Sequence, residues 1–292
     1  MEDLISIIFP VKNEGNNVLN TLNSLISTKT NRSYEVIIVD DNSEDGCCDF
    51  LKDFKSTVPI KYIKANGIGS SQARNVGAEA TKGKYLIFCD AHLFFEDYWL
   101  DKMIKPLENN LTNAVTPIIS PHDNPKVKGY GQTLNMTNFR AKWNGVRTEL
   151  SDTAILSGGC FAISREIFFA VGGFEKRFRV WGFEDIEFSI RMWLFGYKCS
   201  VEPSVQILHI FRKVFPYQMN ANFSDYNMIR LAYSHFSEER IEKCKKFVRS
   251  QQLTNQFVED NIKDSVLEQR ALYFSKRKYD DDWFLNKFNI EF

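Results

Sequence analysis

Short apolar runs alternate with amphipathic segments over the first third of the chain, and this alternation constrains the fold more than any other feature. After the first run, Val18, Leu22 and Leu25 recur at helical spacing. Strands that alternate with helices predict successive βαβ units, and therefore an α/β fold with a mostly parallel sheet. Ligands of such sheets bind beyond the carboxyl ends of the strands. The runs, rich in Val, Ile and Tyr, occupy residues 4–10, 35–40, 60–64 and 85–90.

The second half of the chain is organised differently. Residues 120–150 contain Gly, Pro and aromatic residues without periodicity, which predicts a loop or an irregular strand pair over the site. A strand-like run from residue 153, a helix that opens near Glu184 and a strand that ends at His209 follow. We therefore expect a sheet domain flanked by helices over residues 1–225 and a C-terminal helical extension over residues 226–292.

Charge and cysteine content exclude several classes of protein. The chain has 37 basic and 37 acidic residues, so no overall positive charge favours nucleic acid. Its six cysteines form no C-x-x-C pair, which argues against a zinc knuckle or a disulfide framework. The N-terminus does not resemble a signal peptide, and no apolar stretch reaches the roughly 18 to 20 residues of a membrane span. These features predict a cytoplasmic protein without a transmembrane span, and they leave peripheral association with a membrane open.

Polar residues follow the first two predicted strands, in FPVKNEG (9–15) and VDDNSEDG (39–46). This order places Asn13 and Asp41 at adjacent strand ends. A carboxylate there can accept the imide N–H of a uracil, and the turn at Pro10 lets backbone groups meet the ring. Asp and Asn are also common turn formers and helix caps, so each motif alone has a purely structural interpretation. The two motifs together favour a nucleotide site.

The fourth predicted strand ends in the pattern Asp-Ala-His. Residues two apart on a strand share one side, so Asp90 and His92 can face the same ion. A carboxylate and imidazoles suit Mn²⁺ or a similar first-row metal better than Mg²⁺ or Ca²⁺. A nucleoside diphosphate leaving group needs such an ion to neutralise the charge that builds on its β-phosphate. The pattern alone is weak, and its place at a strand end strengthens it.

Glu184 and Asp185 open the predicted helix directly after the Trp181-Gly182 turn. Acidic residues in a first helical turn can simply complement the helix dipole. An indole beside them, however, offers a flat platform for a sugar ring, which favours a site.

His209 follows an apolar run, where a histidine is usually a satisfied core residue. With Asp90 and His92 it would instead complete a three-residue metal shell. The basic Arg212 would then lie where a diphosphate binds. We expect the segment 212–225 to close over donor and metal.

The motifs between about residues 4 and 220 resemble the catalytic domain of polypeptide N-acetylgalactosaminyltransferases and the wider inverting family that includes bacterial polysaccharide synthases. The similarity is closest in CDAHLFFEDYWL (89–100), VWGFEDIE (180–187) and HIFRKVFPY (209–217). It implies a GT-A fold, a UDP-sugar donor and Mn²⁺, or another divalent metal, bound by Asp90, His92 and His209.

The chain departs from this family at one position. The mucin-type enzymes, which retain the anomeric configuration, have Asn after the Glu of their W-G-G-E-N motif, whereas here Asp185 follows Glu184. A Glu-Asp pair resembles the inverting polysaccharide-type enzymes and the β-1,4-galactosyltransferases, in which that Asp is the general base.

The resemblance therefore predicts that residues 1–225 form a GT-A glycosyltransferase domain that moves a hexosyl or N-acetylhexosaminyl group from a UDP-sugar to an acceptor hydroxyl. Asp185, beside Glu184, would deprotonate the hydroxyl and give inversion. The acceptor would be a glycan, a peptide or a lipid-linked sugar, bound beside Trp181. The expected donor-binding residues are Pro10, Asn13, Glu14, Asp41, Arg74, Asp90 and Arg212.

Three alternatives remain at this point. The first is a retaining, mucin-type-like transferase to peptide Ser or Thr, with Asp185 only orienting the acceptor. The second is a non-catalytic subunit that binds nucleotide sugars, against which the intact Asp90, His92, His209 and Asp185 argue. The third is a nucleotidyltransferase, whose glycine-rich opening is absent from residues 9–15.

Overall fold

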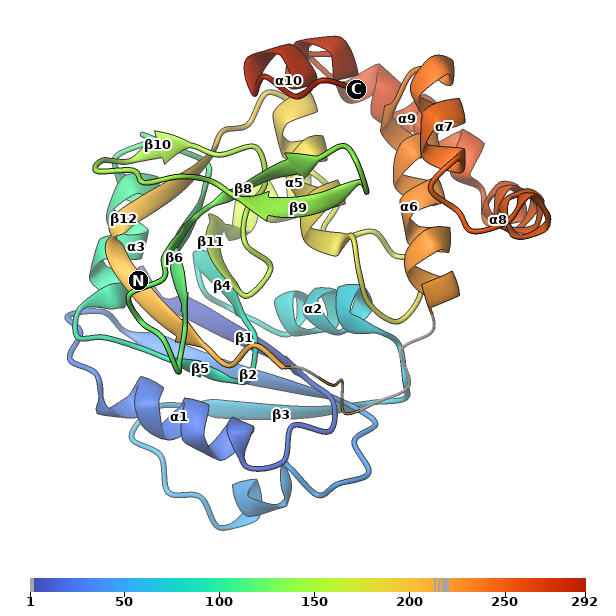
Figure 1. Cartoon of the computed structure of the whole chain (residues 1–292). Helices are drawn as coiled ribbons and strands as arrows, with labels where there is room; N and C mark the ends of the chain where they lie inside the picture. Colours follow the sequence, from blue (N-terminus) through green and yellow to red (C-terminus); the bar gives the residue numbers. More distant parts are fainter. Residues whose placement is uncertain (1–2, 213, 215, 217–220) are drawn as a thin grey trace.

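The computed structural model describes residues 3–212, 214, 216 and 221–292, and in this part of the chain a ten-stranded mixed sheet carries helices on both faces (Figure 1). β1 lies between β2 and β4 and runs parallel to both, and β3 continues the parallel order beyond β2. These four strands match the four apolar runs of the sequence. They are β1 (Ile5–Val11), β2 (Tyr34–Asp41), β3 (Ile60–Ala65) and β4 (Tyr85–Cys89).

Of the three long strands in the other half of the sheet, one is reversed. β11 (Cys160–Ser164) runs antiparallel to both β4 and β6 (Ala114–Pro121), and β12 (Cys199–His209) runs parallel to β6. The strand-like run from residue 153 thus becomes a sheet strand only from Cys160. The expected α/β fold with a mostly parallel sheet is confirmed. Three short strands complete the sheet: β5 (Leu93–Phe94), β7 (Gly129–Tyr130) and β10 (Ser151–Asp152).

Alternating side chains of the central strands pack into two separate cores. Val36 and Ile38 of β2 face one core, whereas Ile37 and Val39 face the other, because successive side chains of a strand point to opposite sides. Residues of α1 and α3 join the first core, and residues of α2, α4 and α5 join the second. The helices are α1 (Asn17–Ser27), α2 (Ser70–Glu79), α3 (Trp99–Glu108), α4 (Arg165–Ala170) and α5 (Glu184–Leu194).

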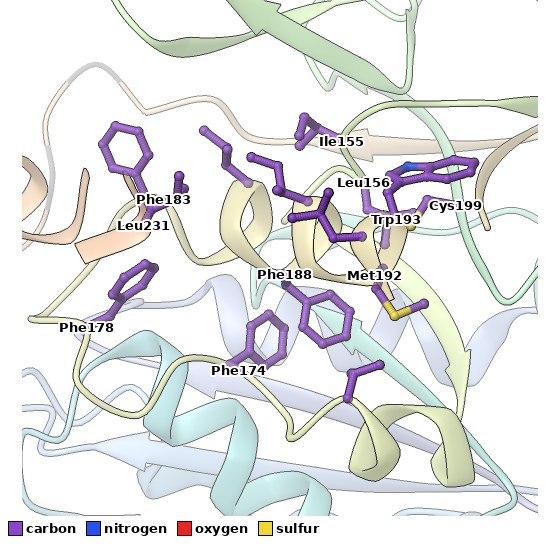
Figure 2. Close-up of a cluster of buried hydrophobic side chains, with 14 of the residues drawn as sticks. Ile155, Leu156, Phe174, Phe178, Phe183, Phe188, Met192, Trp193, Cys199 and Leu231 are labelled. Atoms are coloured by element: carbon purple, nitrogen blue, oxygen red, sulfur yellow. The ribbon is translucent and has the colours of Figure 1, made fainter. Parts of the chain in front are cut away.

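α5 is buried on nearly all sides. Figure 2 shows two of its own buried side chains, Phe188 and Trp193, with Phe174 of the preceding segment beside Phe188. Its polar pair also lies inside the protein: Arg191 donates two hydrogen bonds, of 2.8 and 2.7 Å, to the Glu187 carboxylate one turn earlier. Both side chains are at most 1% exposed, so α5 holds a fully desolvated ion pair in the core.

The C-terminal helices share this core. Tyr226 and Ile229 of α6 are completely buried and belong to the same cluster as Phe183. The expected boundary between residues 225 and 226 falls inside α6, and the division of the chain there stays a prediction. The helices are α6 (Ala221–His235), α7 (Glu238–Lys245), α8 (Gln251–Lys263), α9 (Val266–Lys276) and α10 (Asp281–Lys287).

The irregular region predicted over the site contains a hairpin. β8 (Gln132–Asn135) and β9 (Arg140–Trp143) form a separate two-stranded antiparallel sheet. Gln132 also forms an isolated bridge with Ile155, which ties the hairpin to the chain that precedes β11. A short 3₁₀ helix, η1 (Asp49–Lys52), lies after β2.

The six cysteines, all within the described residues, are free and buried. Cys89 and Cys160 face each other across β4 and β11 with their Sγ atoms 3.6 Å apart.

Candidate functional site

A cavity of about 460 Å³ lies at the carboxyl ends of β1, β2 and β4, between the hairpin β8–β9 and the start of α5. Its position is the one expected for a ligand of a parallel sheet. Among the predicted site residues, Asn13 is the one that does not line it. The other predicted site residues all line it: Pro10, Glu14, Asp41, Arg74, Asp90, His92, Trp181, Glu184, Asp185, His209 and Arg212.

The predicted metal ligands come together at one wall of this cavity. Asp90 and His92 lie in the connection after β4, and His209 is the last residue of β12. The backbone N–H of Asp90 donates to Gly159, and that of Ile210 donates to the carbonyl of His92, over 2.9 and 3.1 Å. These bonds, rather than alternation along a strand, bring the three side chains together. One ligand atom from each lies within 4.8 Å of the other two.

The two carboxylate oxygens of Asp90 have different surroundings. Oδ2 lies 3.4 Å from Nε2 of His209 and 3.8 Å from Nε2 of His92. Oδ1 instead accepts a hydrogen bond of 3.0 Å from Arg74, which is 3% exposed. Arg74 therefore holds one oxygen and leaves the other directed at the two imidazoles.

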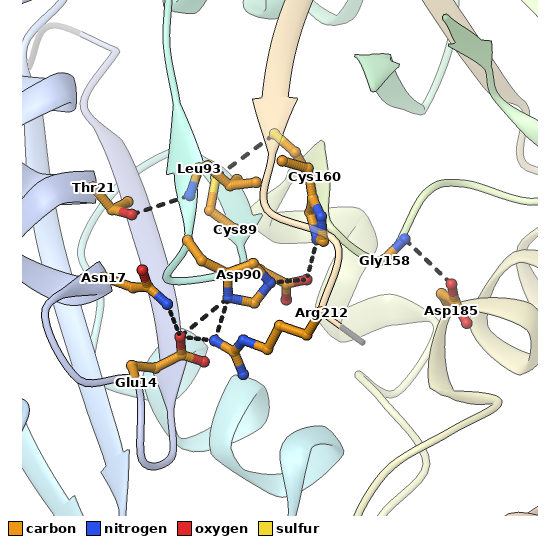
Figure 3. Close-up of polar contacts among 12 residues, drawn as sticks. Glu14, Asn17, Thr21, Cys89, Asp90, Leu93, Gly158, Cys160, Asp185 and Arg212 are labelled. Carbon is orange, nitrogen blue, oxygen red and sulfur yellow. Dashed lines mark hydrogen bonds and ion pairs between the residues drawn. The ribbon is translucent and has the colours of Figure 1, made fainter. Parts of the chain in front are cut away.

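The outer nitrogen of His92 contacts two further side chains. Nδ1 lies 3.2 Å from Oε2 of Glu14 and 2.9 Å from a guanidinium nitrogen of Arg212. Arg212 also forms an ion pair with Glu14 (Figure 3). Glu14 is only 8% exposed, so this contact lies in the protein and not on its surface.

The electrostatics of the cluster favour the protonation states that bind metals. Burial alone would raise the pKa of Asp90, but the hydrogen bond with His209 and the nearby His92 and Arg74 hold that pKa well below its usual range. Burial lowers the pKa of His92 against the attraction of Asp90. An ionised carboxylate and a neutral imidazole are the forms in which these groups ligate a metal.

Glu184 and Asp185 begin α5 but have different environments. Glu184 accepts hydrogen bonds from Ser70, from Arg74 and from the backbone of Gly182, so both of its oxygens are bonded. Among the described residues, Asp185 accepts only from backbone N–H groups, those of Gly158 at 3.2 Å and of Ile186, its neighbour in the helix, at 2.9 Å. Burial, and then the charge of Glu184, raise the pKa of Asp185 to about 7. Asp185 thus suits proton exchange near neutral pH.

Asp41 and Asn13 both organise loops at the strand ends. The Asp41 carboxylate accepts hydrogen bonds of 2.6 and 2.9 Å from the backbone of Ile68 and Gly69, and so fixes the turn before α2. Asn13 accepts from the backbone of Glu44 over 2.8 Å and donates to the carbonyl of Pro216 over 3.2 Å. Asp41 combines this structural contact with a place in the cavity wall, whereas Asn13 links the surrounding loops.

Trp181 lies at the cavity rim and is 37% exposed. The turn that carries it depends on Gly182, whose φ of +105° is a conformation that side chains disfavour. Part of the segment expected to close over the donor, namely residues 213, 215 and 217–220, lies outside the described residues.

Several lining residues were not predicted individually. Gln132, Arg140 and Trp143 reach the cavity from the hairpin β8–β9, and Gly158 reaches it from the turn before β11. The only sequence signal for the hairpin was its Gly-rich, aromatic composition. Arg140 also stacks on the ring of Phe183 at 4.9 Å, a contact that requires the fold to be known.

Comparison with known families gives two matches. Residues 6–171 match the glycosyl transferase family 2, and residues 144–215 match a family described as the N-terminal domain of galactosyltransferase. The first match spans the sheet from β1 to β11, and the second contains Trp181, Asp185 and His209.

Comparison with curated proteins finds polypeptide N-acetylgalactosaminyltransferases. Polypeptide N-acetylgalactosaminyltransferase 8 of Drosophila melanogaster is 32% identical over 225 residues, which cover 71% of this chain and 38% of that protein. Polypeptide N-acetylgalactosaminyltransferase 11 of Xenopus tropicalis is 28% identical over 265 residues, covering 80% of this chain and 43% of that protein. The chain thus spans less than half the length of these relatives.

Solved structures support the GT-A fold. GalNAc-T7, crystallised with UDP, GalNAc and Mn²⁺, superposes with a TM-score of 0.74 at 21% identity, over 99% of this chain and 57% of that one. Residues 1–349 of S. aureus TarS in complex with UDP-GlcNAc give a TM-score of 0.60 at 16% identity, over 85% and 71% of the two chains. Among the described residues, no helix combines the length and the apolar character needed to span a bilayer.

Proposed function

Because the chain belongs to glycosyl transferase family 2, we propose that it transfers a sugar from a UDP-sugar to the hydroxyl group of an acceptor, with a divalent metal bound by Asp90, His92 and His209. The observation that carries this proposal is that these three side chains and Asp185 line one cavity at the carboxyl ends of the parallel strands. The chemistry of the site then follows from which groups face the cavity.

The donor set fits a first-row divalent metal such as Mn²⁺. It offers one carboxylate oxygen and two imidazole nitrogens, all within 4.8 Å, which is close enough to surround one ion. When bound, such an ion supplies positive charge against the diphosphate leaving group. The relatives fit this proposal, since GalNAc-T7 was crystallised with Mn²⁺ and UDP.

The donor would occupy the side of the cavity formed by the ends of β1 and β2. Pro10, Glu14 and Asp41 line this side, and Asn13 holds the two strand-end loops together. Arg212 would then contact the diphosphate, because its guanidinium lies beside the metal ligands. Trp181 would offer its exposed face to the acceptor sugar or peptide.

Asp185 would act as the general base that deprotonates the acceptor hydroxyl, with Glu184 holding the start of α5 in place. Attack opposite to the departing diphosphate would invert the anomeric carbon. Two local observations support this role. Asp185 forms no ion pair with an arginine or a lysine among the described residues. Burial also raises its pKa to about 7. A carboxylate of this kind accepts a proton readily at neutral pH.

Retention is the second candidate, because the curated relatives are polypeptide N-acetylgalactosaminyltransferases. In that case the acceptor would be a peptide Ser or Thr, and Asp185 would orient its hydroxyl. The anomeric coupling of the product distinguishes the two: a β-linked product from an α-linked UDP-sugar means inversion, and an α-linked product means retention.

The test of the function is a panel of UDP-sugars with Mn²⁺, read as slow hydrolysis of the donor without acceptor. We expect one or two donors to be hydrolysed by the wild type, and His209→Ala to lose both hydrolysis and Mn²⁺ affinity while its circular dichroism spectrum is unchanged. His122→Ala is the matched control, since His122 is not among the cavity-lining residues. If no UDP-sugar is bound or hydrolysed, the enzyme proposal is wrong. If His209→Ala folds and keeps full Mn²⁺ affinity, the metal assignment is wrong.

A further inference from the structure

The Nδ1 atom of His92 has two neighbours that make opposite demands on it. Glu14 is a carboxylate that only accepts hydrogen bonds, so a bond over the 3.2 Å to Oε2 requires a proton on Nδ1. Arg212 only donates, so a bond over its 2.9 Å contact requires a bare Nδ1. A single neutral tautomer therefore satisfies one of these neighbours and not both.

A metal at Asp90, His92 and His209 would decide between them. The Nε2 atom of His92 faces Asp90 Oδ2 at 3.8 Å, so it is the nitrogen that would bind the metal. With its lone pair on the metal, the ring carries its proton on Nδ1, and only Glu14 can then accept from it. The contact between Arg212 and His92 belongs to the other tautomer and is incompatible with the loaded site.

We propose that Glu14 is a positioning residue that orients His92 for the metal, and that Arg212 leaves His92 when the metal binds. This inference rests on the proposed metal site. It assigns to Glu14 a role different from the expected direct contact with the donor. It also couples the metal to the donor: in a metal-loaded site Arg212 keeps its ion pair with Glu14 but loses its contact with His92, and a diphosphate can take the place of that contact.

The surroundings of the other two ligands explain why the metal affinity should depend most on Glu14. Asp90 is held through Oδ1 by Arg74, which leaves Oδ2 for the metal. The buried Nδ1 of His209 has no hydrogen-bond partner among the described residues. Among the described residues, Glu14 is thus the one carboxylate outside the three proposed ligands that contacts a ligating imidazole, and the orientation of such an imidazole depends on a contact of this kind.

The first measurement is the affinity for Mn²⁺ alone, obtained by titration with electron paramagnetic resonance of free Mn²⁺. Glu14→Gln should weaken binding roughly 10- to 100-fold, as is typical when a partner of a ligating histidine is removed. Glu14→Asp keeps the carboxylate and should recover part of the loss. Asn17→Ala is the control, because Asn17 also contacts Glu14, over 3.4 Å, but not the cluster. Its affinity should equal that of the wild type.

A second pair of variants tests the release of Arg212. Arg212→Ala removes the donor that competes for Nδ1 and should strengthen Mn²⁺ binding roughly 2- to 10-fold, the worth of one hydrogen bond. Lys12→Ala removes a positive charge from the same cavity without touching His92, and it measures the general effect of lost charge. The gain for Arg212→Ala should exceed the gain for Lys12→Ala.

The tautomer itself can be read from the ¹⁵N chemical shifts of the His92 ring, with Zn²⁺ as a diamagnetic substitute for Mn²⁺. We expect the proton to lie on Nδ1 in the Zn²⁺-loaded wild type and the mixed signal of two tautomers in Glu14→Gln. If the wild type binds neither Mn²⁺ nor Zn²⁺, the proposed metal site is wrong. If the wild type binds Mn²⁺ and folded Glu14→Gln binds it equally well, the metal site stands and the role of Glu14 is overturned.

Discussion

Asp185 and Glu184 are neighbours in sequence, yet the fold gives them opposite conditions. Glu184 is bonded to Arg74, Ser70 and the Gly182 backbone, whereas Asp185 accepts from two backbone N–H groups and forms no ion pair within the described part of the chain. Burial therefore dominates at Asp185 and raises its pKa to about 7. The sequence predicts a catalytic role for both residues. In the structure Asp185 is the candidate base, whereas Glu184 holds the turn before α5.

The pH dependence of turnover should follow the ionisation of Asp185. Because the base is active when ionised, kcat should rise with pH and level off above about 7. Asp185→Asn should lower kcat by about 10² to 10⁴-fold, with little change in UDP affinity. A pH series of initial rates for the two proteins checks this. A kcat for Asp185→Asn near that of the wild type would contradict the role of base.

Asp185→Asn should also raise the free energy of unfolding at alkaline pH, although it lowers activity. The folded state raises the pKa of Asp185 from 3.8 to about 7, so the protein binds this proton more tightly when folded. Its contribution to stability is present below pH 3.8 and is lost as pH rises through 7. Asp185→Asn should therefore be more stable than the wild type at pH 8, by urea denaturation. Equal stability at pH 8 would mean that Asp185 is better solvated than its burial indicates.

At the scale of elements, α5 connects the site to the interior. The Glu187–Arg191 pair is followed by His235 of α6, whose Nε2 lies 2.8 Å from Oε1 of Glu187. Arg191 also donates to the carbonyl of Val171, before the turn that leads to the Trp181 segment. The buried Glu187–Arg191 pair thus joins three segments behind the helix whose first residues face the cavity.

Removing the charge of Glu187 should destabilise the protein strongly. Glu187→Gln leaves Arg191 buried without an anionic partner, which typically costs about 3 to 5 kcal/mol. Despite its burial, the Arg191 charge and the His235 contact lower the pKa of Glu187 to about 2. Its contribution is therefore present above pH 4.5 and lost as pH falls toward 2. Urea denaturation at pH 7 and pH 3 measures both effects, and a wild type equally stable at the two pH values would contradict them.

The structure contains the strands and helices that were predicted from local sequence patterns. The four strands of the parallel half and the start of α5 at Glu184 follow from runs and spacing that lie within a few residues of one another. β11 and the hairpin β8–β9 were less well defined, because their pairing depends on partners far along the chain. The contact of Glu14 with His92 joins residues 78 apart, and that of Arg212 with His92 joins residues 120 apart. A single sequence carries no signal that residues so far apart along the chain are in contact.

At the scale of the whole molecule, the C-terminal helices contribute side chains to one of the two cores of the sheet domain. Phe236, Phe284 and Leu285 lie in the cluster that contains α5. A chain cut after residue 225 would expose this surface and lose most of α6. We expect the truncated chain to be insoluble or to lack a cooperative unfolding transition in urea, measured by tryptophan fluorescence. A soluble fragment that unfolds cooperatively would support the division at residue 225.

The buried thiols give this protein built-in probes of local unfolding. Each of the six cysteines is hidden, at the loop after β2, in the centre of the sheet, in β12 or in α7, so a thiol reagent reacts only when that region opens. The rates of modification under native conditions therefore report the opening free energy region by region, without any introduced label. A mass spectrum taken during such a reaction would rank the loop after β2, the sheet and the C-terminal helices by how often each one opens locally.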